Sequence, residues 1–342
     1  MRKTLQRLTL PFAFMVLSLP APGKTVKGGK TGKQRAESTQ SGPALLWRYP
    51  ADLATRNLFY GPGGKEHQPH SRFTFIKEDL HGSNPKFLVH DENGVKWTVK
   101  LGEEAQPETA ASRLVWAAGY FANEDYFLRE ILIENIPPHL KRAKKFVAPD
   151  GSMHNVRLKR HLEGEEKISI WKWRDDPFTG TREFNGLRVL MAVINNWDLK
   201  DVNNEIYREK HEPELIYMVS DLGASFGATG HIWPHRLSKG NLDSYRRSKF
   251  ITRVTPEYVD FKVPSRPSFL YAGKLRAYLR RLHLRWIGKE IPRSDARWMG
   301  QLLARLSTNQ IQDAFRAAGY STKEVEGFAA VIQDRIAELN DL

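Results

Sequence analysis

Cysteine is absent from the 342 residues of this chain. Its absence excludes disulfide scaffolds, thiolate metal sites and cysteine nucleophiles. Long apolar runs are scarce as well: a single stretch near the N-terminus is a candidate to enter a membrane, which excludes a polytopic membrane protein. The remaining composition is ordinary for a globular protein, with 40% hydrophobic and 27% charged residues. The chain can therefore form a sizeable core, arranged as roughly two domains or one large two-lobed domain.

The N-terminus has the layout of a secretory signal peptide. The basic residues Arg2 and Lys3 precede an apolar run over 8–19, and small residues follow up to Gly23. The run is about 12 residues long, whereas a transmembrane helix needs ~20. We predict a signal peptide over 1–23 and an exported protein, periplasmic or secreted, with no integral membrane domain after cleavage. The alternatives are an N-terminal core helix and an uncleaved anchor.

The net charge of +14 is concentrated in two segments. Segment 236–285 holds 13 basic and 3 acidic residues, and segment 24–43 holds five basic residues and one acidic residue. Since 24–43 is also rich in glycine, serine and threonine, we interpret it as a flexible basic linker. A basic balance suits nucleic acid, an anionic membrane surface or an acidic substrate. The confinement of the charge to two segments argues against nucleic acid and leaves an acidic substrate open.

The sequence pattern changes from mainly strand-type to mainly helical near residue 163. Segment 44–163 is rich in strand-type sequence, most clearly over 86–90 and 95–101, which the turn residues Asn93-Gly94 join into a predicted hairpin. Further strands are predicted over 73–76, 126–133 and 155–161, and a helix over 107–118. Segment 164–342 has mainly helical patterns.

The helices of the second part are predicted over 182–196, 274–287, 294–306, 307–318 and 321–339. Two of them begin with capping-box patterns, Ser307-x-x-Gln310 and Ser321-x-x-Glu324. A strand-rich lobe followed by a helical lobe is an α+β arrangement.

The sharpest chemical pattern is Asp198-Leu199-Lys200-Asp201-Val202-Asn203, followed by Asp221-Leu222-Gly223. Phosphoryl transfer requires a positioned nucleophile, a clamp on the phosphates and metal ions that neutralise charge. In this pattern one carboxylate can orient a substrate hydroxyl, and a lysine two residues later can stabilise the transferring group. An amide oxygen and a second carboxylate can hold Mg²⁺. The glycine after Leu222 allows a sharp backbone turn beside the metal.

These residues resemble the catalytic loop and the metal-binding loop of the protein kinase fold. Asn196-Trp197 stands where His-Arg is usual, Leu222 replaces phenylalanine in Asp-Phe-Gly, and no Ala-Pro-Glu motif follows. These departures are typical of atypical kinases and put activation-loop regulation in doubt. The sequence spacing between Asp198 and Asp221 is similar to that of HipA-like kinases. The secretory-pathway and spore-coat kinases share the same general arrangement of these motifs.

The strand-rich segment 44–163 holds residues that resemble the nucleotide-binding motifs of the same fold. Lys100, on the second strand of the predicted hairpin, looks like the lysine that contacts nucleotide phosphates, with Glu108 as its ion-pair partner. The stretch Gly82-Ser83-Asn84-Pro85-Lys86 is similar to the phosphate loop of HipA-like kinases, in which backbone N–H groups cradle anions. A Gly-x-Gly-x-x-Gly motif is absent. The motifs of the resemblance span roughly residues 80–225.

The resemblance implies a two-lobed protein-kinase-like fold, with an N-lobe over 44–163 and a helical C-lobe over 164–342. It implies transfer of the ATP γ-phosphate to a hydroxyl of a protein or small molecule, with Mg²⁺ or Mn²⁺. The implied roles are Asp198 and Lys200 in catalysis, Asn203 and Asp221 on the metal, and Lys100, Glu108, Gly82, Ser83 and Lys86 on the nucleotide. The alternatives are an exported pseudokinase and a basic binding module without catalysis, since ATP is scarce outside the cytoplasm.

Two other patterns point weakly to different chemistry. His67-x-x-His70 has the spacing of zinc ligands but lacks an evident third ligand. Gly223-Ala-Ser225-Phe-Gly227 matches the letters of a serine-hydrolase elbow, yet that elbow needs a strand before it and a helix after it. The glycines and the proline that follow Gly227 predict a loop instead.

Overall fold

The computed structural model describes residues 42–342, except 83, 230–236, 264–278 and 280–281. The predicted signal peptide over 1–23 and all but the last two residues of the predicted linker over 24–43 lie outside the described residues. Half of the predicted helix over 274–287 lies outside them as well, and its last four residues belong to a 3₁₀ helix, Leu284–Gly288. Within the described part of the chain, no helix is both long and apolar enough to cross a membrane.

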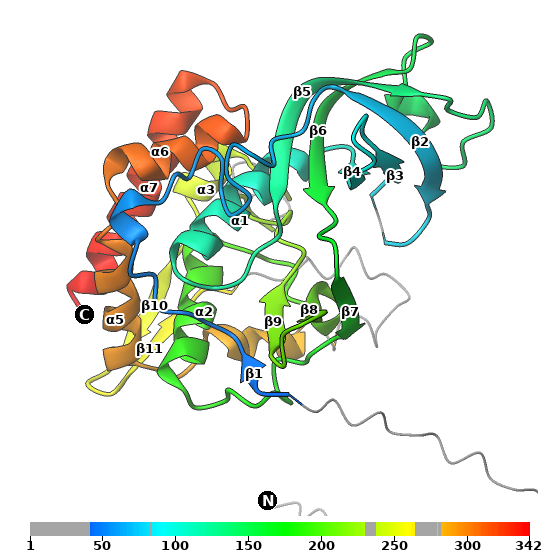
Figure 1. Cartoon of the computed structure of the whole chain (residues 1–342). Coiled ribbons are helices and arrows are strands. Elements are labelled where there is room, and N and C mark those ends of the chain that lie inside the picture. The colour runs from blue at the N-terminus through cyan, green and yellow to red at the C-terminus, as the bar shows by residue number, and fades with distance from the viewer. Residues whose placement is uncertain (1–41, 83, 230–236, 264–278, 280–281) are drawn as a thin grey trace, which may run out of the picture. The chain divides into compact units, whose positions relative to one another are not determined.

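A closed five-stranded barrel forms the first part of the fold (Figure 1). Its strands, in spatial order, are β2 (Arg72–Asp79), β3 (Lys86–His90), β4 (Lys96–Lys100), β6 (Ser152–Arg160) and β5 (Asp125–Glu134). The predicted hairpin is β3–β4, and Gly94 in its turn has a φ of 77°, which glycine adopts without steric cost. The barrel closes on its own apolar core, which includes Phe87, Val99 and Leu158.

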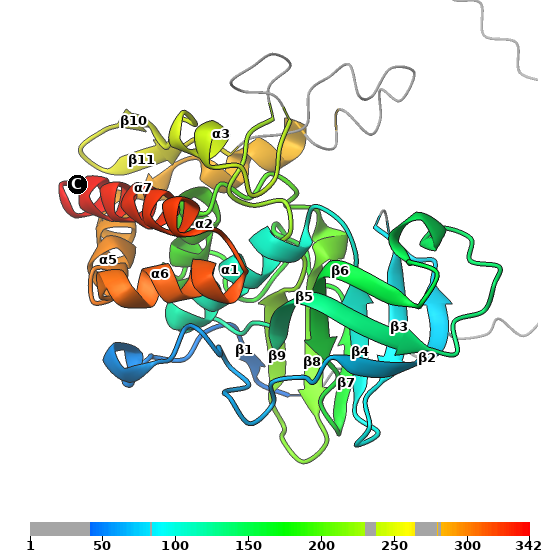
Figure 2. The same ribbon diagram turned by 90° about the horizontal axis from the view of Figure 1, so that it is seen from above.

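Helix α1 (Ala105–Ala117) lies between the barrel and the helical part in both views (Figures 1 and 2). Its apolar residues, among them Leu114 and Val115, belong to the larger of the two main cores rather than to the barrel core. Gly119 ends the helix with a φ of 90°, and a Cβ there would stand 2.3 Å from the carbonyl oxygen of Arg48. The predicted helix over 107–118 is therefore present, shifted by one or two residues.

A second sheet begins the C-terminal part, in the order β1 (Ala44–Leu45), β9 (Leu215–Val219), β8 (Asn204–Glu209) and β7 (Glu165–Ser169). Strand β1 pairs parallel with β9. The first described residues thus join the second sheet, and Leu53 and Leu58 lie in the larger core. None of these four strands is among those predicted above from the sequence.

Helix α2 (Arg182–Val193) precedes the loop that carries Asp198. It ends earlier than the predicted 182–196, because Asn195 adopts a positive φ of 51°. The remaining elements are α3 (Leu242–Arg246), β10 (Ile251–Val254), β11 (Tyr258–Phe261), β12 (Ile291–Pro292), α5 (Arg293–Leu303), α6 (Thr308–Ala317) and α7 (Thr322–Asn340).

Both predicted capping boxes are formed at the starts of α6 and α7. At α6 the hydroxyl of Ser307 accepts a hydrogen bond from the backbone of Gln310 at 3.2 Å, and the Gln310 side chain accepts one from the Ser307 N–H at 3.0 Å. The predicted α+β class, with a strand-rich part followed by a helical part, is confirmed.

Candidate active site

The two loops that carry the predicted catalytic and metal-binding residues run side by side. The N–H of Trp197 donates to the carbonyl of Ala224 at 3.2 Å, and the N–H of Ser220 donates to the carbonyl of Asn203 at 2.8 Å. The N–H of Asp221 lies 3.4 Å from the same carbonyl of Asn203. These backbone contacts bring Asn203 and Asp221, which are 18 residues apart in sequence, to neighbouring positions.

Two hydrogen bonds within the loop before β8 hold the backbone of Asp198 in place. Its N–H donates to the side-chain oxygen of Asn196 at 3.0 Å, and its carbonyl accepts a hydrogen bond from the side-chain nitrogen of Asn203 at 2.5 Å. Because the Asn203 amide nitrogen is engaged, its oxygen is the atom that could serve as a metal ligand. The Lys200 ammonium lies 2.9 Å from Oδ2 of Asp198. The predicted catalytic pair is thus brought together.

The Lys100 ammonium is the centre of a buried ion cluster. It lies 2.7 Å from Oε2 of Glu108 and 3.2 Å from Oδ1 of Asp221, and its side chain is 5% exposed. Burial alone would lower the pKa of Lys100, but the surrounding carboxylates outweigh burial and raise it above its ordinary value. The lysine is therefore charged at neutral pH. The structure places it against both the predicted ion-pair partner and a predicted metal ligand.

Sequence reasoning missed Arg157, which completes the cluster on the barrel side. Its guanidinium lies 2.8 Å from Oε1 of Glu108 and 2.9 Å from Oδ1 of Asp125. The β4–β6 register places Arg157 directly opposite Lys100. Residues opposite each other on adjacent strands share one face of a sheet. Two cations in one row therefore require buried carboxylates on the same face.

The carboxylate Glu104 was also missed, although it precedes Glu108 by four residues, a spacing that places both on one helix face. Its two oxygens lie 2.6 Å from the Lys100 ammonium and 2.6 Å from that of Lys239. Burial alone would raise the pKa of Glu104, but Lys100 and Lys239 outweigh burial and lower it. For Glu108, burial dominates and raises the pKa to about 7, although Arg157 and Lys100 oppose it.

The predicted phosphate loop connects β2 to β3, next to this cluster. Gly82 has a φ of 74°, in the left-handed region, and Ser83 lies outside the described residues. The Lys86 ammonium pairs with Asp79 at 3.2 Å rather than with the buried cluster. In the β3–β4 register Lys86 lies opposite Lys100, so the two lysines occupy neighbouring positions in one cross-strand row.

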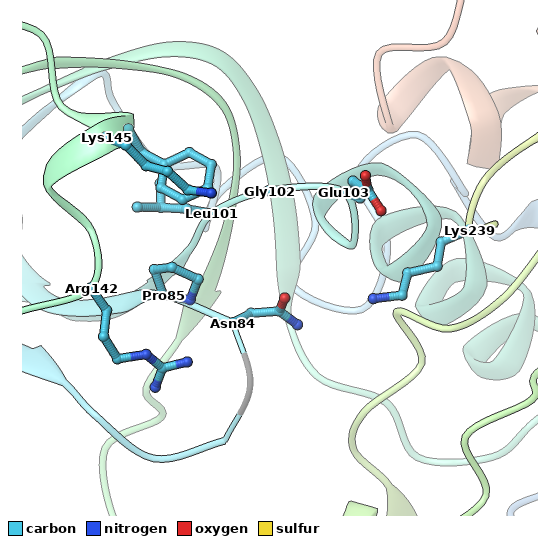
Figure 3. A pocket seen from close by; sticks show the side chains of 9 residues that line it. Asn84, Pro85, Leu101, Gly102, Glu103, Arg142, Lys145 and Lys239 are labelled. Carbon is cyan, nitrogen blue, oxygen red and sulfur yellow. The ribbon is translucent and has the colours of Figure 1, made fainter. Parts of the chain in front are cut away.

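A cavity of about 560 Å³ opens beside the phosphate loop (Figure 3). Asn84 and Lys239 face each other across it. Both side chains also bind the carboxylate of Glu104. The other lining residues include Arg142, Lys145 and Phe146. The cavity has the size of an ordinary small-molecule site, and its cations suit an anionic ligand.

The donor set near Asp221 fits a divalent metal ion. One carboxylate oxygen from each of Glu104, Glu108 and Asp221 lies within 4.8 Å of the others. The Asp221 side chain is 41% exposed, whereas the two glutamates are buried. Because the Lys100 ammonium lies against all three carboxylates, the ligands best placed for Mg²⁺ or Mn²⁺ are the half-exposed carboxylate of Asp221 and the amide oxygen of Asn203.

The two weaker sequence patterns do not form sites. His67 pairs with Glu124 at 2.8 Å and His70 pairs with Glu92 at 3.0 Å, so the two histidines have different partners. Ser225 is fully buried. A hydrolase nucleophile must instead be exposed at the top of its turn.

No family model and no curated protein matches the chain. Among solved structures, the Helicobacter pylori proinflammatory kinase CtkA is 12% identical with a TM-score of 0.44, covering 80% of this chain and 97% of that chain. A Golgi casein kinase is 11% identical with a TM-score of 0.35, covering 80% and 73%. The Golgi casein kinase with Mn/ADP bound is 12% identical with a TM-score of 0.32, covering 79% and 75%. At these identities and TM-scores, no conclusion about the fold or the function of this chain rests on the similarity.

Proposed function

We propose that this chain is an atypical kinase-like phosphotransferase that moves the γ-phosphoryl group of metal-bound ATP to a hydroxyl group. The observation that carries this proposal is the position of Lys100, buried against both Glu108 and Asp221. A lysine between a helix glutamate and a metal-loop aspartate is the arrangement that grips nucleotide phosphates.

Each residue of the site has a role in this reaction. Lys100 binds phosphate oxygens, and Glu108 keeps its ammonium in place. Asn203 and Asp221 would hold Mg²⁺ or Mn²⁺, which neutralises charge on the phosphates when bound. Asp198 orients the acceptor hydroxyl and receives its proton, while Lys200 offsets charge on the transferred group.

The bonds balance in a single displacement. The acceptor oxygen forms a bond to the γ-phosphorus, and the bond from that phosphorus to the β,γ-bridging oxygen breaks. The acceptor proton passes to the carboxylate of Asp198, and ADP leaves. The protein needs no covalent intermediate, because positioning and charge stabilisation supply the catalysis.

The substrate and location belong to this proposal as well. The basic segment 236–285 follows Asp221-Leu222-Gly223 in the chain, 13 residues after Gly223, which favours an acidic acceptor that is a protein or a small hydroxylated molecule. The basic residues, apolar run and small residues over 1–23, which have the layout of a signal peptide, favour export. Mass spectrometry of the mature N-terminus checks export independently of activity.

The first experiment is a thermal shift of the full chain with Mg²⁺·ATP. A ligand present at a hundredfold excess over its dissociation constant stabilises the native state by about 2.7 kcal/mol. We expect a metal-dependent shift that Asp221→Ala abolishes. The variant Asp175→Asn is the control, because it also removes one carboxylate charge, at an exposed residue whose ion-pair partner is Lys172.

Transfer is tested with Asp198→Ala and radiolabelled ATP. We expect this variant to lose transfer and to keep most of its nucleotide affinity. Retained turnover would overturn the role of Asp198. Nucleotide binding without turnover in the wild type would show a pseudokinase, and the absence of any nucleotide shift would leave a basic binding module, whose affinity falls steeply with salt.

A further inference from the structure

The Glu104 carboxylate is held by donors from three separate parts of the chain. The ammonium of Lys100 comes from β4, and the ammonium of Lys239 follows the metal loop. The side-chain amide of Asn84, in the predicted phosphate loop, donates to the same carboxylate. Two ammonium groups and an amide therefore converge on one buried anion.

These donors are the kinds of group that bind phosphate in proteins. A phosphoryl group and a carboxylate both present anionic oxygens bonded to one central atom, and both accept charge-assisted hydrogen bonds from ammonium groups. The Glu104 side chain is 8% exposed, so its contacts replace solvent almost completely. A phosphate brought to these donors would compete directly with Glu104.

Lys239 is held in place by contacts of its own. The carbonyl of the preceding residue, Ser238, accepts a hydrogen bond from the Trp197 indole at 3.2 Å, and the Lys239 ammonium lies 5.7 Å from the Trp197 ring centroid. Trp197 adjoins Asp198 in the chain. Lys239 is therefore a fixed cation linked to the catalytic loop and facing the cavity of Figure 3.

Glu104 also contacts the metal loop. A Cβ built on Gly223 would stand 2.7 Å from Cβ of Glu104 and 2.9 Å from its Oε2. The glutamate thus fills the space between the loop before α1 and the backbone next to Asp221. Withdrawal of Glu104 from its donors would open this space beside the predicted metal ligand.

We propose that Asn84, Lys100 and Lys239 form a phosphate subsite that the Glu104 carboxylate occupies in the ligand-free protein. The inference deepens the proposed function and rests on it: the ligand is a phosphate group of a nucleoside triphosphate. Binding exchanges one anion for another, so Glu104 leaves as the phosphate enters. Lys239 becomes a nucleotide-binding residue, and the Glu104–Lys239 ion pair opens with each binding event.

The test measures binding of Mg²⁺·ATP and of Mg²⁺·tripolyphosphate to the full chain by isothermal titration calorimetry. Glu104→Gln keeps the size of the side chain and removes its charge. We expect it to bind both ligands at least tenfold more tightly than the wild type. Lys239→Met placed in the Glu104→Gln background should reverse this gain.

Glu103→Gln is the matched control. Glu103 is the exposed neighbour of Glu104 and lines the same cavity, so this variant removes one negative charge without touching the three donors. It should change affinity far less than Glu104→Gln does. An equal gain in both variants would show a general charge effect and would overturn the subsite. Circular dichroism of each variant verifies its fold.

The remaining outcomes separate this inference from the proposed function. If ATP binds in an Asp221-dependent way and Glu104→Gln leaves its affinity unchanged or weaker, the subsite is wrong and the phosphotransferase stands. If tripolyphosphate binds more tightly to Glu104→Gln while ATP binds to neither protein, the anion subsite stands and the nucleotide function falls. If neither ligand binds to either protein, both are wrong.

Discussion

Removal of the Arg157 guanidinium should be one of the most costly single changes at this site. Arg157 lies opposite Lys100 in the barrel and contacts Glu108 and Asp125. In Arg157→Met, Glu108 keeps Lys100 as a partner. Asp125, which is 1% exposed, loses its ion pair, and its Oδ2 already has no hydrogen-bond partner among the described residues. Breaking a buried pair in this way costs about 3–5 kcal/mol.

Urea unfolding followed by tryptophan fluorescence measures this cost. The double variant Arg157→Met, Asp125→Asn removes the stranded charge, so we expect it to regain part of the free energy of unfolding that the single variant loses. If the free energy of unfolding of Arg157→Met lies within about 1 kcal/mol of the wild-type value, Asp125 is not left as an uncompensated buried charge, and the reasoning is wrong.

Two further predictions concern burial and close packing. Burial raises the pKa of Tyr245 to about 12, so the native state holds this proton more tightly than the unfolded state does. The free energy of unfolding should therefore fall between pH 10 and pH 12 by about 2 kcal/mol more in the wild type than in Tyr245→Phe, measured by urea unfolding at each pH; parallel curves would contradict this. Gly223→Ala places a Cβ 2.7 Å from Cβ of Glu104 and should lower the free energy of unfolding by about 1–3 kcal/mol; an unchanged unfolding midpoint would refute the close contact.

Local sequence patterns predicted the elements whose signals lie within a few residues. The β3–β4 hairpin follows from its turn residues, and the starts of α6 and α7 follow from reciprocal caps formed within four residues. Strand β8 was missed, because its six residues follow Asn203 without a turn signal and a short run of this kind has no distinctive period. The 3.6-residue pattern continued α2 past its true end, where Asn195 leaves the helical conformation.

The residues of the candidate site likewise fall into those that a local pattern predicts and those that only long-range contacts bring to the site. The spacing of Asp198, Asn203 and Asp221 was visible in the sequence, and the structure sets their loops side by side. The role of Arg157 depends on the register between β4 and β6, which are more than 50 residues apart. Lys239 meets Glu104 across 135 residues. Contacts of that range depend on how the barrel closes and where the segment after Asp221 lies, which no local pattern encodes.

Helix α1 carries Glu108 and begins directly after Glu104, so its packing determines which part of the protein these glutamates move with. Leu114 lies in the larger core, while Leu158 of β6 lies in the barrel core. Leu114→Ala and Leu158→Ala delete the same groups from these two cores, each at a cost of about 2–5 kcal/mol. If α1 belongs with the helical part, native-state hydrogen exchange in α1 should rise in Leu114→Ala and stay low in Leu158→Ala, where the faster exchange is confined to the barrel strands. Faster exchange of α1 in Leu158→Ala would instead show that the glutamates move with the barrel. In the first case the Lys100–Glu108 pair joins two separately packed cores, so a ligand that binds both residues couples the barrel to the helices.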